Sequence, residues 1–303
     1  MTERSDWMQI DWSEHLRWVR VHDRLVNVLD IGDGPPIVFL HGLAGCWQNW
    51  LEAIGAFARD HRVIAIDFPG FGASEMPSEP ISIPGYVRGL DELFDALSIG
   101  SATIVGNSMG GFVGADMSIR LPHRVQRLVL VAAAGLSMEH MLNERNQGLR
   151  ARIENLLFFG LRRLAAHTDL VVRSRRLRRG LLTLVVAHPE RLSGPLVLEQ
   201  VNGAGKPGFH AALDAMVRYP IRDRLGEIDV PTLILWGELD RLVPLRDAGE
   251  FAWLIRDARK VVYEDTGHMV MLERPERFNA DVRTFIETPA VVTLESWRQR
   301  RKS

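Results

Sequence analysis

Short apolar runs alternate with helix-like segments along most of this chain. The first run, at 35–42, is continuously apolar, which is typical of a strand buried on both faces of a sheet. Strands of this kind that alternate with amphipathic helices occur in parallel sheets covered by helices on both sides. The sequence therefore predicts an α/β fold with a mostly parallel sheet. The runs are PPIVFLHG (35–42), HRVIAIDFPGFG (61–72), a strand that ends with TIV (103–105), VQRLVLVAAAG (125–135), VPTLILWGELD (230–240) and DARKVVYEDTGH (257–268).

Helical spacing of apolar residues fills the intervals between these runs. It predicts helices at 45–60, 84–98, 110–120 and 273–286. Ahead of the first run, the stretch 16–32 predicts two strands joined by a turn at His22 and Asp23.

The alternation stops between Leu136 and Arg222, where the pattern is helical with a proline- and glycine-containing middle. We interpret 136–222 as a helical cap inserted into a core made of 1–135 and 223–303. Its apolar stretches NLLFFGLRRL and LLTLVVAH are expected to roof a hydrophobic acyl pocket. The polar, basic tail 295–303 is expected to be loose.

Arginines are dense in the first part of this cap. We interpret them as a solvated helix face, while attraction of anionic substrates or contact with a membrane surface or partner remains open. They are Arg145, Arg150, Arg152, Arg162, Arg163 and those of RSRRLRRG (173–180).

Composition narrows the class of protein without fixing the activity. The 303 residues are 46% hydrophobic and 25% charged, with a net charge of −1, as in a soluble globular protein with no general tendency to bind nucleic acid. No apolar run approaches the length of a membrane span, and the first residues lack the regions of a signal peptide. The single cysteine, Cys46, excludes an internal disulfide, and a cytoplasmic location is expected. The oligomeric state is left open.

A serine stands at the apex of a predicted strand–turn–helix in TIVGNSMGGFVG (103–114). The pattern Gly106-x-Ser108-x-Gly110 alone is weak, because an ordinary glycine turn produces it too. A strained turn of this kind exposes a hydroxyl for nucleophilic attack. The hydroxyl needs a base, and the base needs an acid that fixes its tautomer.

The base is expected after a late strand, because reactive groups gather at the carboxyl ends of parallel strands. His268 directly follows the predicted strand of 257–268. Histidines at other positions are interpreted as surface or packing residues: His123 at a helix end, and His140, His167, His188 and His210 in the cap.

Four carboxylates follow late strands and are candidates for the acid. Asp240 ends the tight turn GELD and is the preferred choice, with Glu238 two residues earlier. Glu264 and Asp265 are interpreted as solvated loop charges. The order Ser108, Asp240, His268 is then nucleophile, acid, base.

These features together resemble the α/β-hydrolase family, from about residue 16 to 287. The resemblance implies a mostly parallel α/β-hydrolase sheet with helices on both faces and a helical cap. The motifs that carry it are HGLAG (41–45), DFPGFGAS (67–74), GNSMGG (106–111), LWGELDRLVP (235–244) and DTGHMVMLERPERF (265–278).

The same resemblance implies an oxyanion hole made by the backbone N–H groups of Leu43 and Met109. Met109 would begin a helix, where free donors and the helix dipole favour negative charge. His41 is by resemblance a residue that supports this loop. Cys46 and Trp50 are interpreted as packing residues, whereas Trp47 is a candidate substrate contact.

The leading hypothesis is a serine hydrolase that cleaves carboxylic esters of small molecules through an acyl-enzyme, an esterase or lipase-like enzyme without a metal or other cofactor. The alternative is a carbon–carbon bond hydrolase of dienol-diketones of the meta-cleavage type, whose helical cap and GNSMGG motif are similar. Perhydrolase or haloperoxidase activity and a non-catalytic binding protein also remain open. Met269 argues against the carbon–carbon alternative, because that group resembles a GHW pattern after its histidine.

Overall fold

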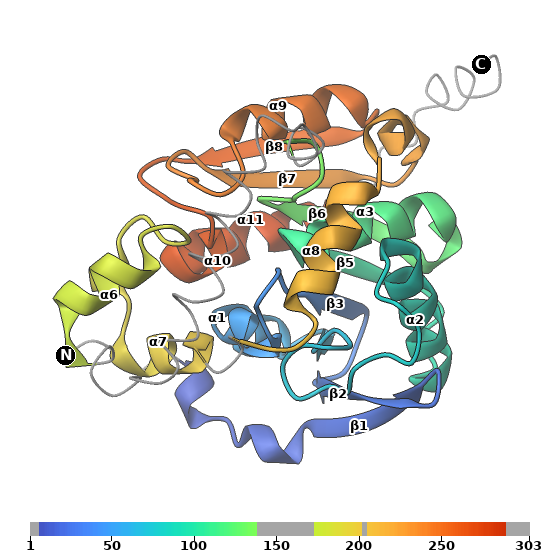
Figure 1. Cartoon of the computed structure of the whole chain (residues 1–303), viewed down its shortest axis with the longest axis horizontal. Helices are drawn as coiled ribbons and strands as arrows, with labels where there is room; N and C mark the ends of the chain where they lie inside the picture. Colours follow the sequence, from blue (N-terminus) through green and yellow to red (C-terminus); the bar gives the residue numbers. More distant parts are fainter. Residues whose placement is uncertain (1–5, 138–172, 202–204, 289–303) are drawn as a thin grey trace.

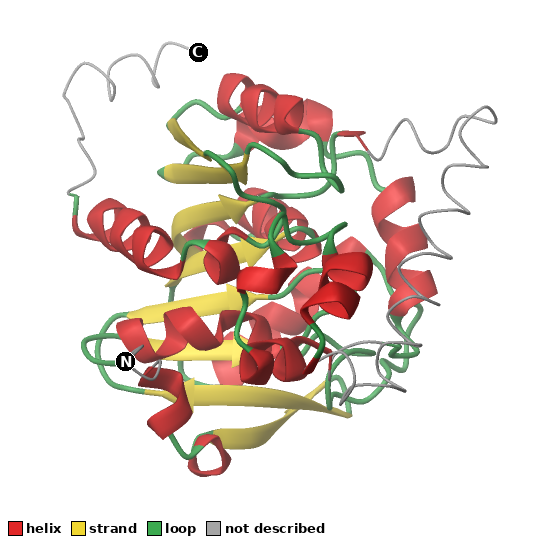
Figure 2. Ribbon diagram, turned by 90° about the vertical axis from the view of Figure 1, so that its left-hand side faces the viewer, coloured by secondary structure: helices red, strands yellow, loops and turns green. Residues whose placement is uncertain are grey.

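The computed structural model describes residues 6–137, 173–201 and 205–288. A twisted sheet runs through the middle, with helices packed on both of its faces (Figures 1 and 2). The predicted fold class, a mostly parallel α/β sheet, is confirmed.

Eight strands form one sheet in the order β1-β2-β4-β3-β5-β6-β7-β8. β1 pairs antiparallel with β2, and β2 pairs antiparallel with β4, whereas all later neighbours are parallel. The carboxyl ends of β3 and β5 to β8 therefore lie on one edge. The strands are β1 (Leu16–Val21), β2 (Arg24–Ile31), β3 (Pro36–Leu40), β4 (Arg62–Ile66), β5 (Ala102–Asn107), β6 (Val125–Val131), β7 (Thr232–Gly237) and β8 (Ala258–Tyr263).

Successive residues of the central strands enter two separate cores, because side chains alternate across a sheet. In β3, Val38 and Leu40 face α2, α3 and α9, whereas Ile37 and Phe39 face α1 and α11. All four side chains are fully buried, which explains the unbroken apolar runs of the sequence. The helices are α1 (Leu51–Phe57), α2 (Ile83–Ala96), α3 (Met109–Arg120), α6 (Arg175–Leu182), α7 (Gly194–Val201), α8 (Phe209–Arg218), α9 (Leu245–Leu254), α10 (Val270–Glu273) and α11 (Pro275–Glu287).

The helix predicted at 45–60 is shorter than its periodicity indicates. The chain first makes a 3₁₀ turn at Trp47–Trp50 and becomes α-helical only at Leu51. The Asp67 carboxylate accepts a hydrogen bond from the Trp47 backbone N–H at 2.8 Å, which fixes the start of this turn from a different loop. The spacing of apolar residues along the chain does not reveal a tertiary contact of this kind.

The helical character predicted between β6 and β7 is present where the structure describes it. α7 packs into the core on the α1 side, while α8 packs into the core on the α2 side and crosses the front of the sheet in Figure 1. The division into a core and a cap stays a prediction. Arg145, Arg150, Arg152, Arg162 and Arg163 lie outside the described residues, as do His140, His167 and the tail 295–303.

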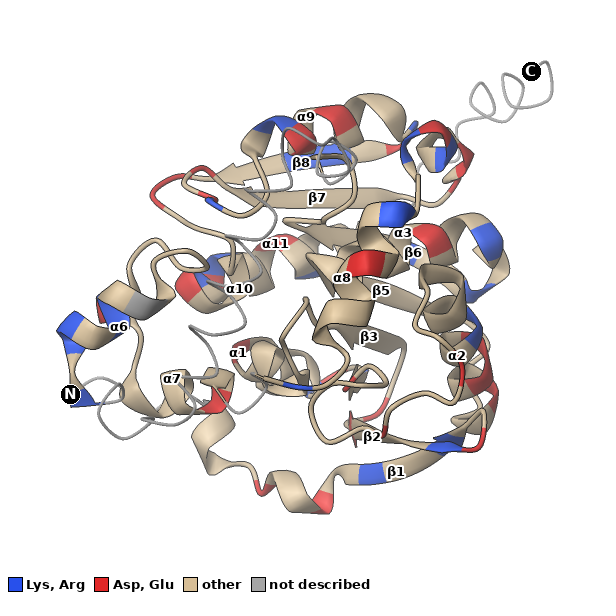
Figure 3. Ribbon diagram, in the orientation of Figure 1, with Lys and Arg blue, Asp and Glu red and all other residues tan. Residues whose placement is uncertain are grey.

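α6 carries the described part of the arginine-rich stretch at one side of the molecule (Figure 3). Arg175, Arg176 and Arg179 are exposed, in line with a solvated face. Arg178 is buried instead, and it donates a hydrogen bond to the carbonyl oxygen of Leu192 at 2.6 Å. Within the described ranges, no helix combines the length and apolarity needed to cross a membrane.

An ion pair joins the loop before β4 to the last helix, and it gives a stability prediction. Hydrogen bonding from Arg283 is the main cause that lowers the pKa of Asp60 to about 2. A depressed carboxyl pKa stabilises the fold above the unfolded value and loses that contribution as pH falls through the folded value. We expect Asp60→Asn to lower the free energy of unfolding at pH 7 by no more than about 1 kcal/mol, because the pair is exposed.

This difference from wild type should shrink as the pH falls below about 4. Urea unfolding at pH 7, 5 and 3.5 measures it, with Asp33→Asn in an exposed loop as the control. A difference that grows on acidification would contradict this assignment.

Candidate active site

Ser108 lies between the end of β5 and the start of α3 in a backbone conformation that non-glycine residues rarely adopt. Its φ of +52° and ψ of −113° leave it outside both strand and helix. Its backbone N–H donates to Val131 O at 3.0 Å, and its carbonyl accepts from Phe112 N at 3.0 Å and Ala134 N at 3.1 Å. The neighbouring strand and the first helical turn therefore hold the strained turn on both sides.

Glycines flank Ser108 because the chain is too crowded there for a side chain. A Cβ on Gly106 would lie 2.3 Å from the carbonyl oxygen of Gly110. A Cβ on Gly110 would lie 2.1 Å from the carbonyl oxygen of Leu40 at the end of β3. The glycines let α3 begin directly against two strands, which presents Ser108 at the edge of the sheet.

Asp240 and His268 form a hydrogen-bonded pair in the loops after β7 and β8. His268 Nδ1 is 2.8 Å from Asp240 Oδ2, and the two side chains are 4% and 0% exposed. The other carboxylate oxygen accepts the backbone N–H groups of Leu242 at 2.8 Å and Val243 at 3.0 Å. Since Nδ1 faces the carboxylate, the proton sits there and Nε2 is the nitrogen left to act as a base.

The other carboxylates near His268 are engaged elsewhere. Glu238 is exposed, and its Oε2 accepts the backbone N–H of Asp265 at 3.3 Å. Asp265 is an exposed loop charge, as predicted, and it also pairs with His188, Arg191 and Arg274. The pairs with His188 and Arg191 join segments far apart in sequence, which local patterns do not reveal.

The loop after β3 lies against Ser108, where the sequence predicts one donor of an oxyanion hole. A Cβ on Gly42 would lie 3.1 Å from Ser108 Cβ. Gly45 N donates to Gly42 O at 3.0 Å, which folds the loop so that Leu43 lines the cavity beside Ser108. Met109 is the first residue of α3, where the helix leaves backbone N–H groups without an intrahelical acceptor.

His41 is buried and fixes this loop through both ring nitrogens. Its Nε2 accepts the backbone N–H of Phe68 at 2.9 Å, so Nδ1 carries the proton and donates to Gly42 O at 2.7 Å. Burial is the main cause that lowers the pKa of His41, which keeps the ring neutral. These contacts tie the loops after β3 and β4 together.

A cavity of about 170 Å³ opens at Ser108 and His268. Its walls are mostly apolar and come from the loop after β3, the segment 182–201, α8 and the loops after β7 and β8. Of the described residues that line it, none is Lys, Arg, Asp or Glu. The polar residues among them are Asn49, Asn107, Ser108, Ser137, Gln200 and His268.

Trp47 packs in the core on the α1 side. It is 5% exposed, and its ring centroid lies 5.4 Å from that of Trp12. The described residues that line the cavity do not include Trp47, so its role as a substrate contact stays a prediction. Trp50 and Cys46 are buried as predicted, and burial raises the pKa of the Cys46 thiol, which leaves it unreactive.

Sequence reasoning missed the amides that line the cavity. Asn49 Nδ2 donates to Gln200 Oε1 at 2.6 Å, and Gln200 Nε2 donates to the carbonyl oxygen of Gln48 at 3.0 Å. Asn107, next to Ser108, donates through Nδ2 to Val131 O at 3.1 Å and to His268 O at 3.5 Å. The only local signal was the position of Asn107 inside the motif GNSMGG.

The mostly parallel sheet and the glycine-flanked strand–turn–helix at Ser108 are typical of the alpha/beta hydrolase fold. The chain belongs to the alpha/beta hydrolase fold family, whose model matches residues 35–275. The predicted family is therefore confirmed.

The names of relatives within the family imply that they cleave different kinds of bond. The 2-hydroxy-6-oxo-6-phenylhexa-2,4-dienoate hydrolase of Comamonas testosteroni is 31% identical over 265 residues, spanning 85% of this chain and 89% of the relative. A mutant of the meta-cleavage product hydrolase CumD has a TM-score of 0.69 at 27% identity, covering 90% of this chain and 98% of that one. An enzyme that degrades N-acyl homoserine lactones also has a TM-score of 0.69 at 27% identity, covering 89% and 100%.

Proposed function

We propose that the chain hydrolyses a bond next to a carbonyl group, with Ser108 as nucleophile, His268 as base and Asp240 as the acid that orients it. The observation that carries this proposal is the buried Asp240–His268 hydrogen bond at the same cavity that Ser108 lines. The carboxylate fixes the imidazole tautomer and stabilises the imidazolium that forms.

The reaction proceeds through an acyl-enzyme. His268 Nε2 takes the Ser108 proton while Oγ adds to the substrate carbonyl, and the resulting oxyanion is held by the backbone N–H groups of Leu43 and Met109. Each such donor lowers the barrier by about 3 kcal/mol. His268 then returns the proton to the leaving group, and water repeats the sequence to release the acid.

For the substrate we propose a dienol-diketone cleaved at a carbon–carbon bond, the alternative in the sequence analysis. The relatives named for such substrates support this class above simple esters. Hydrolysis adds water across the bond, so the acyl carbon receives the hydroxyl and the other carbon receives the proton. Because a free carbanion is a poor leaving group, the dienol must become a ketone first, so that the departing carbon is stabilised by conjugation.

Carboxylic ester hydrolysis remains the second candidate, favoured by one feature of the cavity. A dienoate carries a carboxylate that a cation in the cavity wall would bind, whereas the described lining contains no Lys or Arg. An ester of about four to eight acyl carbons would suit such walls. The likeness to a lactone-degrading enzyme supports the same class.

A side-by-side comparison of kcat/KM distinguishes the two classes. We expect 2-hydroxy-6-oxo-6-phenylhexa-2,4-dienoate to be cleaved at least about tenfold more efficiently than nitrophenyl butyrate or octanoate, a difference of about 1.4 kcal/mol in transition-state binding. The loss of dienoate absorbance and the release of nitrophenol provide the two readouts.

Ser108→Ala is the control for both substrates, because residual cleavage by that variant would come from another source. Efficient ester cleavage with a slower reaction of the dienoate would reverse the preference. The enzyme would then be a carboxylesterase, with the Ser108, His268 and Asp240 roles unchanged.

A further inference from the structure

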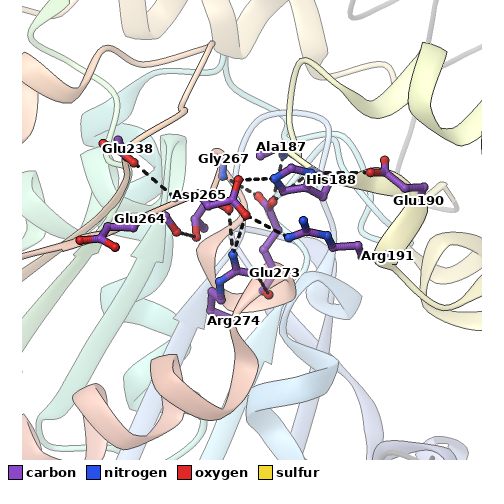
Figure 4. Close-up of polar contacts among 11 residues, drawn as sticks. Ala187, His188, Glu190, Arg191, Glu238, Glu264, Asp265, Gly267, Glu273 and Arg274 are labelled. Atoms are coloured by element: carbon purple, nitrogen blue, oxygen red, sulfur yellow. Dashed lines mark hydrogen bonds and ion pairs between the residues drawn. The ribbon is translucent and has the colours of Figure 1, made fainter.

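A partly buried carboxylate outside the proposed catalytic residues joins the His268 loop to the cavity wall. Glu273, at the end of α10, accepts the backbone N–H of Gly267 through Oε1 at 2.8 Å. Its Oε2 accepts the backbone N–H of Ala187 at 2.9 Å and that of His188 at 3.4 Å (Figure 4). One side chain thus connects the residue that precedes His268 to a segment some 80 positions earlier.

A backbone hydrogen bond reinforces the same junction on the other side of His268. The N–H of Met269 donates to the carbonyl oxygen of Val185 at 3.1 Å. Both neighbours of His268 are therefore tied to the segment 185–188. Val185, Val186 and Met269 line the cavity, so this segment is also part of its wall.

The hydrogen bonds that Glu273 accepts from backbone N–H groups could not easily be replaced by other groups of the protein. Burial raises the pKa of Glu273, against the lowering effect of its three backbone donors. Removal of this desolvated carboxylate would leave its backbone N–H donors without an acceptor, and bulk water could not take its place. Gly267 is crowded as well, since a Cβ there would lie 2.6 Å from Ala187 N and 2.9 Å from Glu273 Oε1.

We propose that Glu273 is a positioning residue, which sets the place of the His268 ring relative to Ser108 by fastening the His268 loop to the wall segment 185–188. This proposal rests on the proposed roles of Ser108 and His268. A shift of about 1 Å in a reacting group costs up to roughly a hundredfold in rate, so a loose loop would slow attack without unfolding the protein.

An outer layer of charges covers the same junction and offers a matched comparison. Asp265 pairs with His188, Arg191 and Arg274 at the surface (Figure 4). The pairs with His188 and Arg191 join the His268 loop to the wall segment and the turn that follows it, whereas Arg274 lies on the same side of the junction as Asp265. The pairs are exposed, so each contributes little. If any link between the segments sufficed, removing Asp265 would have the same effect as removing Glu273.

Labelling of Ser108 by a fluorophosphonate tests this without knowledge of the substrate. The labelled fraction at the end point counts competent sites, and the rate constant reports how well His268 activates Ser108. Glu273→Gln, which replaces one acceptor with a donor, should lower the rate constant roughly ten- to a hundredfold, as should the shorter Glu273→Asp. Asp265→Asn and the exposed Glu276→Gln should stay within about twofold of wild type.

Two results would overturn the role of Glu273. One is a labelling rate constant near the wild-type value in both Glu273 variants. The other is a fall in the labelled fraction alone, which a merely structural role produces. If Glu273→Gln does not fold, Glu273→Asp carries the test. A wild-type protein that takes no label at Ser108 would refute the proposed function instead, so the two failures are distinct.

Discussion

Replacement of Ser108 by alanine is expected to reduce kcat by at least about a thousandfold on any substrate that the wild-type protein turns over. The variant lacks the oxygen that forms the acyl-enzyme, and the remaining groups cannot substitute because they act as a unit. The fold should survive, since the hydrogen bonds of residue 108 in the structure are made by its backbone N–H and carbonyl. Steady-state kinetics and thermal unfolding measure the two effects.

Ser118→Ala is the matched control. Ser118 lies on the same helix α3, is fully buried, and uses its hydroxyl to donate to the carbonyl oxygen of Gly114 at 2.8 Å. This change removes one hydroxyl from α3 away from the described cavity lining, so kcat should stay within about twofold of wild type. Retention of a tenth of the wild-type rate by Ser108→Ala would exclude a covalent role for this serine.

The sheet could be predicted because parallel strands buried on both faces leave an unbroken apolar signal. The run at 35–42 covers β3 at nearly its observed bounds, and the strand end predicted at 103–105 lies within β5. The helix after Cys46 was placed too long, because Asp67 fixes the start of that segment through space. Local periodicity reports which face is buried but contains nothing about a bond from another loop.

The candidate site likewise contains residues that the sequence predicts and residues that it does not. Ser108, Asp240 and His268 each follow a strand, so their convergence at one edge follows from the parallel topology. Glu273 and Gln200 gave no such signal, since the first acts on Gly267 and Ala187, and the second meets Asn49 across 151 positions. Their contacts join the segment 173–201 to the loops and short helices that follow β3 and β8, and the sequence does not specify that packing.

The choice of substrate was the least predictable feature. The ester hypothesis rested on the groups that ester cleavage by Ser108 requires, namely an activated serine, a base and two oxyanion donors. The sequence contains candidates for all of them. The relatives instead favour carbon–carbon cleavage, although Met269 follows the histidine. In the proposed mechanism both substrates would use the same nucleophile and base, so the difference would lie in the cavity wall, where the sequence offered only an apolar pattern.

Exchange of Asp240 for asparagine is expected to lower kcat by up to roughly ten-thousandfold while the shape of the site is kept. The amide oxygen of the variant would accept from the backbone N–H groups of Leu242 and Val243, as Oδ1 of Asp240 does. Its NH₂ group would then face Nδ1 of His268, which must accept rather than donate. The imidazole proton moves to Nε2, so the nitrogen that should take the Ser108 proton is already protonated.

Two neighbouring carboxylates show whether this effect belongs to Asp240 or to negative charge in general. Glu238→Gln and Asp265→Asn each remove a charge within the same pair of loops. Among the described residues, Glu238 accepts the backbone N–H of Asp265 at 3.3 Å, and Asp265 faces His188 and two arginines. Both variants should retain kcat within about threefold, since each changes an exposed contact. If Glu238→Gln were the crippling change, the orienting acid would be Glu238 and the His268 tautomer would have to be set from the surface. The buried bond of 2.8 Å between Asp240 Oδ2 and His268 Nδ1 is the reason to expect the opposite.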